Sequence, residues 1–461
     1  MTGLNDIRVV YFLGIGGIGM SALARYFKHA GFVVSGYDRT ETALTKELVD
    51  EGIDIHYDDR PDWVATELKK EETLVVLTPA VPADMSERIF LENNGFQLKK
   101  RSEVLGMICS GAKTCAVAGT HGKTTVSTML AHILKSSRLD CSAFLGGISK
   151  NYQTNLLLSS VSEWIVAEAD EFDRSFLRLF PDLAVVTSMD ADHLDIYGSH
   201  EAIIESFNDF VAQVKPGGAV VVKRGLPIVQ SRNRQISHYS YSINEQADFQ
   251  AVNLELIDEA YQFDLVHPTG KIENLRLNYP GLLNVENAVA ASSLAILAGV
   301  NEEELKAALA SYQGVKRRFD VRYRSGNYLL IDDYAHHPEE LKATISSVKA
   351  MFAGRWLTGI FQPHLFSRTN DFYHEFAREL SQLDEVILLD IYPAREKPMP
   401  GVSSTLIFDL LTNEQKQLIT KSDLTEVAKY IKPGVVLMMG AGDIDTLVEP
   451  VRKILMEKDH V

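Results

Sequence analysis

A glycine-rich loop between an apolar strand and a helix constrains the fold of this chain most strongly. The loop, Gly119-Thr-His-Gly-Lys-Thr-Thr125, follows a predicted strand from Thr114 to Ala118 and precedes a predicted helix from Val126 to Leu134. Such a unit directs backbone N–H groups and the positive end of a helix at one point, where a polyphosphate binds. Lys123 adds a charge for the β- and γ-phosphates, and the Thr124 hydroxyl is placed to bind Mg²⁺. The segment predicts a protein that cleaves a nucleoside triphosphate.

Composition narrows the class of protein further. The 461 residues are enough for two to four domains, each with its own core. The formal net charge of −16 argues against general nucleic-acid binding, and no apolar run is long enough to span a membrane. Cys109, Cys115 and Cys141 predict buried thiols rather than a disulfide framework or a metal cluster. We expect a cytoplasmic enzyme without a signal peptide, acting on small molecules as a monomer or weak homodimer.

A second glycine pattern lies near the start of the chain. A predicted strand over residues 8–13 leads into Gly14-x-Gly16-Gly17-x-Gly19 and a helix that reaches about Ala30. A second predicted strand, Phe32 to Tyr37, ends in Asp38. Glycines for a tight turn, with an acid after the next strand, form the Rossmann fingerprint. The pattern suits NAD, FAD or any other ligand that carries a diphosphate, and a purely structural glycine turn is the alternative.

Two apolar strands of the second segment end in acidic residues. Glu168 follows residues 164–167, and an acid-rich stretch follows residues 183–189. Because ligands of a parallel sheet bind at the carboxyl ends of its strands, Glu168 is a candidate Mg²⁺ ligand, with a solvated strand-end acid as the alternative. His193 either faces a divalent ion or caps a helix, and the acids around it favour metal binding. These acids are Asp190, Asp192 and Asp195.

Strand and helix patterns predict that the rest of the chain is also folded. Short alternating runs between Ser237 and Tyr279 predict an inserted antiparallel hairpin region, and Pro280 opens a long helix rich in Ala and Leu. The third segment alternates predicted strands with amphipathic helices such as Glu339 to Phe352. We therefore predict an α/β protein whose third segment is another domain of strands and helices. Its strands are expected at residues 328–331, 356–361, 385–391 and 435–439.

Two strand ends of the third segment gather titratable residues. Asp332-Asp-Tyr-Ala-His-His337 follows the first strand, and Gln362-Pro-His-Leu-Phe-Ser-Arg368 follows the second. If these strands are parallel, both ends lie at one edge of the sheet, which is the usual position of a ligand. Arg368 is able to form a bidentate pair with a carboxylate. Each residue singly has a surface side chain as its alternative, whereas the set predicts a binding site.

The ordered set of motifs resembles the Mur ligase family over the whole chain. The set contains both glycine loops and the Asp-His-Leu-Asp stretch around His193. Glycine loops recur in many families, whereas this order of motifs is highly specific. The further motifs are Glu168-Ala-Asp-Glu171, Asn284-Val-Glu-Asn287, Arg317-Arg-Phe319, Asp332-Asp-Tyr-Ala-His-His-Pro338, Phe361-Gln-Pro-His364 and Gly440-Ala-Gly-Asp-Ile444.

The resemblance implies an ATP-dependent ligase of peptidoglycan precursor synthesis. Such a ligase joins L-alanine to the lactyl carboxylate of UDP-N-acetylmuramate through an acyl phosphate, with ATP and Mg²⁺ as cofactors and with no nucleic-acid or membrane partner. The implied architecture is α/β with three domains. These are a Rossmann-like UDP-sugar domain (residues 1–106), a central ATP-binding domain with a parallel sheet like that of P-loop ATPases (residues 107–319), and a Rossmann-like amino-acid domain (residues 320–461).

The resemblance also implies roles for individual positions. Catalysis is implied for Lys123, Glu168 and His193, and metal binding for Thr124, Glu168 and His193. ATP binding is implied for Gly119, Thr120, His121, Gly122, Lys123, Thr124, Thr125, Asn284, Asn287, Arg317, Asp333 and Tyr334. UDP-sugar binding is implied for Gly16, Gly17, Ile18, Gly19 and Asp38. Amino-acid binding is implied for His336, His364 and Arg368.

Two positions depart from the family pattern. Leu365 stands where members that add alanine often have arginine, so capture of the amino-acid carboxylate is expected to rest on Arg368. Phe207 stands where members that add later residues have a carbamoylated lysine, so no lysine-borne carboxylate is expected near the metal.

Three alternative functions stay open at this point. A ligase that adds recycled tripeptide to the same sugar shares the first two domains, but residues 361–369 favour alanine. An NAD-dependent dehydrogenase rests on the first glycine loop alone and leaves Lys123 and Glu168 without a role. A non-catalytic nucleotide-binding regulator would lack turnover.

Overall fold

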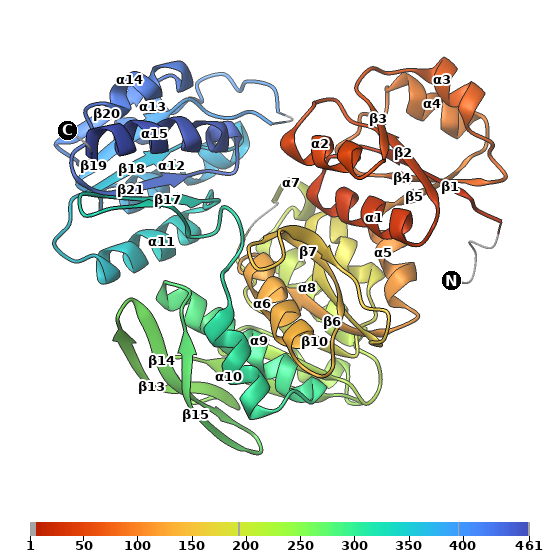
Figure 1. The fold of residues 1–461 in the computed structure, drawn as a ribbon, viewed down its shortest axis with the longest axis horizontal. Helices are drawn as coiled ribbons and strands as arrows, with labels where there is room; N and C mark the ends of the chain where they lie inside the picture. Colours follow the sequence, from red (N-terminus) through yellow and green to blue (C-terminus); the bar gives the residue numbers. More distant parts are fainter. Residues whose placement is uncertain (1–5, 192–193, 395, 460–461) are drawn as a thin grey trace. The chain divides into compact units, whose positions relative to one another are not determined.

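The computed structural model describes residues 6–191, 194–394 and 396–459, without the side chains of Leu194, Asp195 and Ser231. The chain divides into two compact units (Figure 1). Across the described ranges, no helix is both long enough and apolar enough to cross a bilayer. Unit 1 contains Met1–Leu256, Gln262–Asn278 and Val285–Gln313, and unit 2 contains Ile257–Tyr261, Tyr279–Asn284 and Gly314–Val461.

Unit 1 begins with a parallel sheet in the order β3-β2-β1-β4-β5. The chain reverses its direction of winding between β1 and β4, and ligands of such sheets bind in the crevice outside the carboxyl ends of these strands. The elements are β1 (Val9–Leu13), α1 (Ile18–His29), β2 (Val33–Tyr37), α2 (Ala43–Asp50), β3 (Asp54–His56), α3 (Pro61–Glu67), β4 (Thr73–Leu77), α4 (Ser86–Asn93), β5 (Gln97–Lys100) and α5 (Arg101–Cys109).

The second sheet has the order β15-β14-β13-β12-β11-β10-β6-β9-β7-β8. Neighbours from β13 to β7 pair in parallel, and β8 is antiparallel to β7. The elements are β6 (Lys113–Ala118), α6 (Lys123–Ser136), β7 (Ser142–Ser149), β8 (Thr154–Leu157), β9 (Trp164–Ala169), η1 (Phe172–Arg178), β10 (Leu183–Val186), α7 (Leu194–Tyr197), α8 (His200–Ala212), β11 (Ala219–Lys223), η2 (Gln230–Arg232), β12 (Ser237–Ser242), β13 (Phe249–Ile257), β14 (Ala260–His267), β15 (Gly270–Leu277), α9 (Leu282–Ala298) and α10 (Glu302–Ser311).

The predicted hairpin region differs from the structure at its first strand. Strands β13, β14 and β15 follow one another through two-residue turns, as hairpins do. Strand β12, which the prediction included in this region, instead pairs in parallel with both β11 and β13. The alternation of apolar and polar residues identifies the faces of a strand but not its direction, so it could not separate β12 from the hairpins.

Unit 2 contains a third sheet in the order β16-β17-β21-β18-β19-β20. Strand β16 is antiparallel to β17, and the other neighbours are parallel. The elements are β16 (Asp320–Arg324), β17 (Tyr328–Asp333), α11 (Pro338–Met351), β18 (Leu357–Phe361), α12 (Phe366–Leu380), β19 (Glu385–Leu389), α13 (Thr405–Phe408), β20 (Gln415–Ile419), η3 (Lys421–Asp423), α14 (Leu424–Ala428), β21 (Gly434–Met439), η4 (Asp443–Leu447) and α15 (Val448–Asp459).

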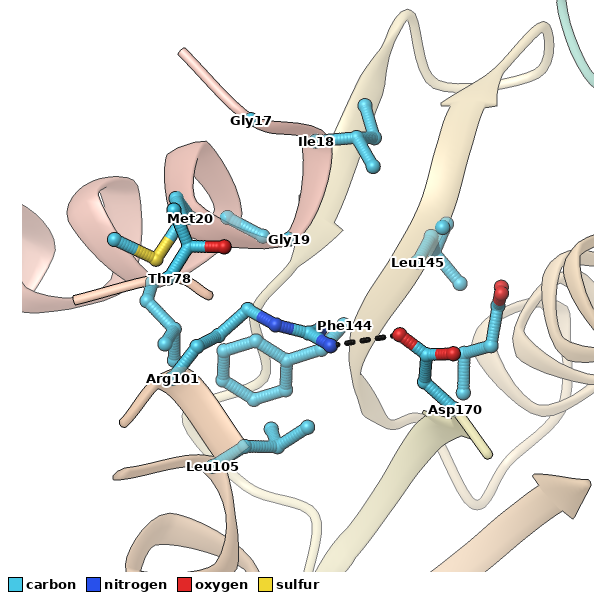
Figure 2. Close-up of a pocket in the computed structure, with 14 residues that line it drawn as sticks. Gly17, Ile18, Gly19, Met20, Thr78, Arg101, Leu105, Phe144, Leu145 and Asp170 are labelled. Carbon is cyan, nitrogen blue, oxygen red and sulfur yellow. Dashed lines mark hydrogen bonds and ion pairs between the residues drawn. The ribbon is translucent and has the colours of Figure 1, made fainter. Parts of the chain in front are cut away.

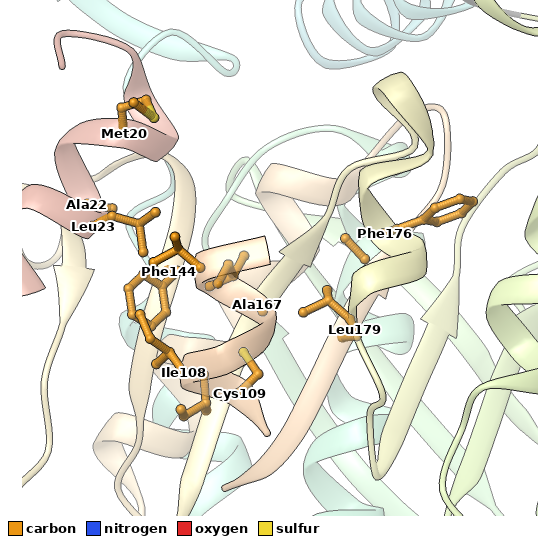
Figure 3. Close-up of a cluster of buried hydrophobic side chains, with 14 of the residues drawn as sticks. Met20, Ala22, Leu23, Ile108, Cys109, Phe144, Ala167, Phe176 and Leu179 are labelled. Carbon is orange, nitrogen blue, oxygen red and sulfur yellow. The ribbon is translucent and has the colours of Figure 1, made fainter. Parts of the chain in front are cut away.

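The first two sheets share a hydrophobic core within unit 1 (Figure 3). Met20 and Leu23 of α1 and Ile108 of α5 belong to the same buried cluster as Phe144 of β7. Tyr26 also packs against Phe144, with 5.4 Å between the ring centroids. This contiguous core fixes the first glycine loop relative to the strands that carry the second. The mixed α/β class with parallel-rich sheets is confirmed.

Candidate nucleotide and substrate site

The phosphate loop connects the buried strand β6 to helix α6. Gly119 (φ 143°) and Gly122 (φ 83°) have positive φ angles that disfavour other residues. A Cβ atom on Gly119 would collide with the Thr187 hydroxyl at the end of β10, so the loop also depends on glycine for space. His121 N–H donates to Ser188 Oγ (2.7 Å), which fastens the loop to the same strand end. Gly122 is the N-cap of α6 and has no side chain to cap the helix, so the first-turn N–H groups are available to bind an anion.

Lys123 is held at the loop by a buried carboxylate. Its Nζ donates to Glu171 Oε2 (2.7 Å), to Glu171 Oε1 (2.9 Å) and to Gly119 O (2.6 Å). Burial alone would lower the pKa of Lys123, but Glu171 and the neighbouring acids raise it above its ordinary value. Burial raises the pKa of Glu171 to about 7, and the charge of Lys123 opposes that rise. The lysine therefore stays cationic, as a ligand of phosphates must be.

Thr124 and Glu168 lie together, as expected for two ligands of one magnesium ion. Strands β6 and β9 are parallel neighbours, and Thr124 Oγ1 donates to Glu168 Oε1 (3.2 Å). A Cβ atom on Gly146 of β7 would collide with the Glu168 carboxylate, so the neighbouring strand leaves room for this side chain. A hydroxyl and a carboxylate are hard oxygen donors that suit Mg²⁺.

The third predicted metal ligand, His193, lies outside the described residues together with Asp192. Asp190, which precedes them, lies beside the phosphate loop: its N–H donates to Thr120 Oγ1 (3.0 Å), and its carboxylate is 3.6 Å from His121 Nε2. Within the ranges that are described, no three His, Cys, Asp or Glu side chains form a metal-binding group.

The two asparagines predicted to contact the nucleotide lie on the first turns of α9. Asn287 is buried beside the phosphate loop, since a Cβ atom on Gly122 would lie 3.1 Å from its Oδ1. Asn284 is also buried, and its side-chain nitrogen donates to Pro280 O (2.5 Å).

The first glycine loop borders a pocket of unit 1 with a volume of about 260 Å³ (Figure 2). Gly17, Ile18 and Gly19 line it, whereas Gly16 and Asp38 support the loop, with Gly16 N–H donating to Asp38 Oδ2 (2.8 Å). The pocket extends to the acids at the carboxyl end of β9. Its other lining residues include Thr78, Arg101, Phe144, Leu145, Glu168 and Asp170.

Two buried aspartates of unit 2 end strand β17. Asp333 accepts from the N–H groups of Phe319 and Ala335, both at 2.8 Å. Burial raises the pKa of Asp333 to about 6 and that of Asp332 to about 7. The guanidinium of Arg317 lies over the Tyr334 ring, 5.1 Å from its centroid. The predicted nucleotide contacts Arg317, Asp333 and Tyr334 thus form one cluster.

The three residues predicted to bind the amino acid also lie together in unit 2. The rings of His336 and His364 meet edge to face with centroids 5.7 Å apart, and Arg368 Nη1 is 3.5 Å from His364 Nδ1. Tyr392 stacks on His364 at 5.8 Å. Leu365, which replaces the second arginine, is buried with φ 71° at the N-cap of α12.

Several side chains at these sites were not predicted. Glu171 is the last residue of the motif Glu168-Ala-Asp-Glu171, but the sequence did not predict a role for it. Its burial beside Lys123 depends on the fold. Arg101 follows Lys99 and Lys100. This run of basic residues at a strand end is the sequence signal that could have identified Arg101 as a binding residue. Tyr392 directly follows the predicted strand at residues 385–391, but no motif marks it. Phe207 is fully buried against Phe176 (5.1 Å between centroids), which is a core position.

The fold and the site define a nucleotide-binding α/β protein with a phosphate loop beside strand-end acids. Family models match in three consecutive ranges: Mur ligase family, catalytic domain, at residues 9–113; Mur ligase middle domain at residues 117–295; and Mur ligase, glutamate ligase domain, at residues 317–442. The chain belongs to the Mur ligase family.

Named relatives and solved structures extend this similarity. The chain is 51% identical to the UDP-N-acetylmuramate–L-alanine ligase of Parabacteroides distasonis over 99% of each chain, and 48% identical to that of Phocaeicola vulgatus over 99% of this chain and all of the relative. The structure of the UDP-N-acetylmuramate–alanine ligase of Thermotoga maritima matches with a TM-score of 0.81 and 26% identity, covering 98% of this chain and 99% of that one. A murein peptide ligase of Psychrobacter arcticus shares the fold with a TM-score of 0.72 at 22% identity, over 97% of this chain and 98% of that one.

Proposed function

We propose that this chain is an ATP-dependent ligase that joins L-alanine to the lactyl carboxylate of UDP-N-acetylmuramate. The observation that carries the proposal is the 51% identity, over 99% of each chain, to a ligase named for this reaction. The grouping of Lys123, Thr124 and Glu168 at the phosphate loop supports the use of ATP and Mg²⁺. We also propose a cytoplasmic location, which the resemblance to the family implies.

The reaction needs activation because a carboxylate and an amine do not condense in water unaided. In the proposed sequence, a lactyl carboxylate oxygen attacks the γ-phosphorus of ATP and ADP leaves, which gives an acyl phosphate. The alanine amine then attacks the acyl carbon, loses a proton, and inorganic phosphate leaves. Mg²⁺, when bound, neutralises negative charge on the phosphate oxygens.

The residues of the phosphate loop carry the first step of this proposal. The Lys123 ammonium faces the transferring phosphoryl group, and the loop and α6 N–H groups bind the phosphates. Thr124, Glu168 and His193 would hold the metal ion. We assign nucleotide binding also to Asn284, Asn287, Arg317, Asp333 and Tyr334.

The amine must lose its proton in the second step. His193 or a neighbouring acid accepts it in this proposal, and His336, His364 and Arg368 orient the amino acid. Gly16, Gly17, Ile18, Gly19 and Asp38 serve the UDP-sugar. The boundaries at residues 106 and 319 stay predictions, and residue 106 falls within α5.

A turnover assay tests the function directly. Phosphate release is measured with ATP, Mg²⁺ and UDP-N-acetylmuramate, and either alanine or the cell-wall tripeptide is added. We expect release that depends on both the sugar nucleotide and alanine. Turnover with the tripeptide but not with alanine would show that the chain is the recycling ligase. Bound NAD without phosphate release would support a dehydrogenase.

A further inference from the structure

The pocket beside the first glycine loop contains a guanidinium group for which the sequence motifs predicted no role. Arg101 is the first residue of α5, directly after β5, and its side chain lies over the first turn of α1 (Figure 2). A Cβ atom on Gly19 would come within 2.6 Å of Arg101 Nη1. The absence of a side chain at Gly19 therefore lets the cation approach the start of the helix.

An acid in the same pocket orients this cation. Arg101 Nη2 donates to Asp170 Oδ2 at 2.9 Å, and the two side chains are 23% and 33% exposed. Asp170 lies two residues beyond Glu168 and one residue before Glu171, which holds Lys123. The ion pair thus stands between the first glycine loop and the acids of the phosphate loop.

The topology of the first sheet places this cation in its ligand crevice. The glycine loop follows β1, Thr78 follows β4 and Arg101 follows β5, so all three lie at the carboxyl edge of neighbouring parallel strands. The winding reverses between β1 and β4, which is where open α/β sheets bind ligands. Gly17 is the N-cap of α1, and the first-turn N–H groups of a helix have no intrahelical partner.

We propose that Arg101 binds the diphosphate of the UDP-sugar, supplying the cation that the glycine loop lacks, and that Asp170 positions its guanidinium. The inference rests on the proposed function for the identity of the sugar nucleotide. A diphosphate at the start of α1 meets backbone donors from one side and a planar, permanently charged fork from the other. Because Asp170 accepts at Nη2, the Nη1 edge beside Gly19 faces the crevice.

Calorimetric titration of the full-length enzyme with UDP, UDP-N-acetylmuramate and Mg²⁺–ADP tests this inference. Arg101→Gln is expected to raise the Kd for both uridine nucleotides at least tenfold and to change the Kd for Mg²⁺–ADP less than twofold. Arg101→Lys is expected to recover part of the affinity, because an ammonium retains the charge but not the fork. The matched control is Lys100→Gln, which removes an adjacent exposed cation paired with Asp173 outside the pocket. It should bind all three ligands like the wild type.

The other outcomes bear either on the assignment of Arg101 or on the proposed function. Unchanged UDP binding by Arg101→Gln overturns the assignment. A loss confined to UDP-N-acetylmuramate, with UDP unchanged, also overturns it, because the cation would then serve the lactyl carboxylate. If Arg101→Gln loses Mg²⁺–ADP binding as well, the assignment stands only if Arg101→Lys binds Mg²⁺–ADP like the wild type and both uridine nucleotides more weakly; any other result with Arg101→Lys overturns it. A wild type that binds UDP but adds no alanine refutes the proposed function and leaves the role of Arg101 intact.

Discussion

Lys123 provides the sharpest test among single residues, because its ammonium group is buried among acids at the phosphate loop. Lys123→Ala removes the charge that the proposed mechanism places opposite the transferring phosphoryl group, and we expect kcat to fall by roughly 100-fold or more. Lys135→Ala is the matched control: it lies on the same helix and pairs with Asp140 (2.6 Å) away from the loop. Phosphate release per folded enzyme is the measurement. Near-normal release from Lys123→Ala would refute the phosphoryl-transfer role.

Glu168 tests the metal site. Glu168→Gln keeps the shape of the side chain but removes a charge, so we expect apparent Mg²⁺ affinity to fall by about tenfold or more, with partial recovery of turnover at high Mg²⁺. Titration of turnover with Mg²⁺ measures this shift. Glu163→Gln, an exposed acid just before the same strand, serves as the control. A wild-type Mg²⁺ dependence in Glu168→Gln would make Glu168 a strand-end acid only.

Asp332 links the protonation of a buried carboxyl to stability. Burial raises its pKa to about 7 in the folded protein, above the unfolded value of about 3.9. The folded state therefore binds the extra proton, and this contribution is complete below about pH 4 and is lost as the pH rises through 7. We expect the unfolding free energy of the wild type to fall relative to Asp332→Asn by on the order of 2–4 kcal/mol across this range. Chemical denaturation at several pH values checks this, and parallel pH profiles would contradict it.

At the scale of elements, the phosphate loop was predictable because its geometry depends on adjacent residues. The glycines at 119 and 122 have the positive φ angles that such a turn needs. Helix α6 nevertheless starts at Lys123 rather than at the predicted Val126. Thr124 and Thr125 are β-branched and weak helix formers, so local propensity predicts that the helix starts after them. In the structure, both residues nevertheless lie in its first turn.

Other parts of the site were not predictable because they depend on contacts between distant elements. The Arg101–Asp170 ion pair joins residues 69 positions apart, and neither the motif that contains Asp170 nor the basic run before Arg101 predicts that they meet. The stacking of Tyr392 on His364 likewise follows from strand order, since β18 and β19 are parallel neighbours and the two residues pair just beyond their carboxyl ends. Sequence predicted which strand ends carry polar side chains; the fold determines which of these side chains meet.

Helix α12 provides the test of amino-acid capture. It holds Arg368 at 7% exposure beside His364, and Leu365 removes the second arginine. If the alanine carboxylate depends on this one guanidinium, as we propose, Arg368→Ala should raise the KM for alanine at least about tenfold and leave that for ATP nearly unchanged. Arg368→Lys should restore only part of the loss. The control Arg378→Ala changes an exposed arginine on the same helix, and steady-state kinetics for each substrate decide. An unchanged alanine KM would move the amino-acid site elsewhere.

At the scale of the whole molecule, the α/β class followed from the alternation of strands and helices, whereas the sharing of cores did not. The first two sheets contribute to one buried cluster that includes Phe12 of β1 and Ala116 of β6. The pattern of apolar residues predicts that they are buried but does not predict which sheet they pack against. The sequence therefore indicated a separate core for each domain. This joint core keeps the pocket and the phosphate loop in one unit.

Hydrogen exchange tests this assignment of ligands to units. All lining residues of the pocket belong to unit 1, so UDP-N-acetylmuramate alone should slow amide exchange there, most strongly at residues 17–23 and 101–105. Mg²⁺–ADP should protect residues 119–128, because ligand binding lowers the population of locally open states. Mass spectrometry of peptides resolves the two patterns, and Arg101→Gln should lose the first while retaining the second. Equal protection of residues 314–461 by UDP-N-acetylmuramate alone would contradict a sugar site contained in unit 1.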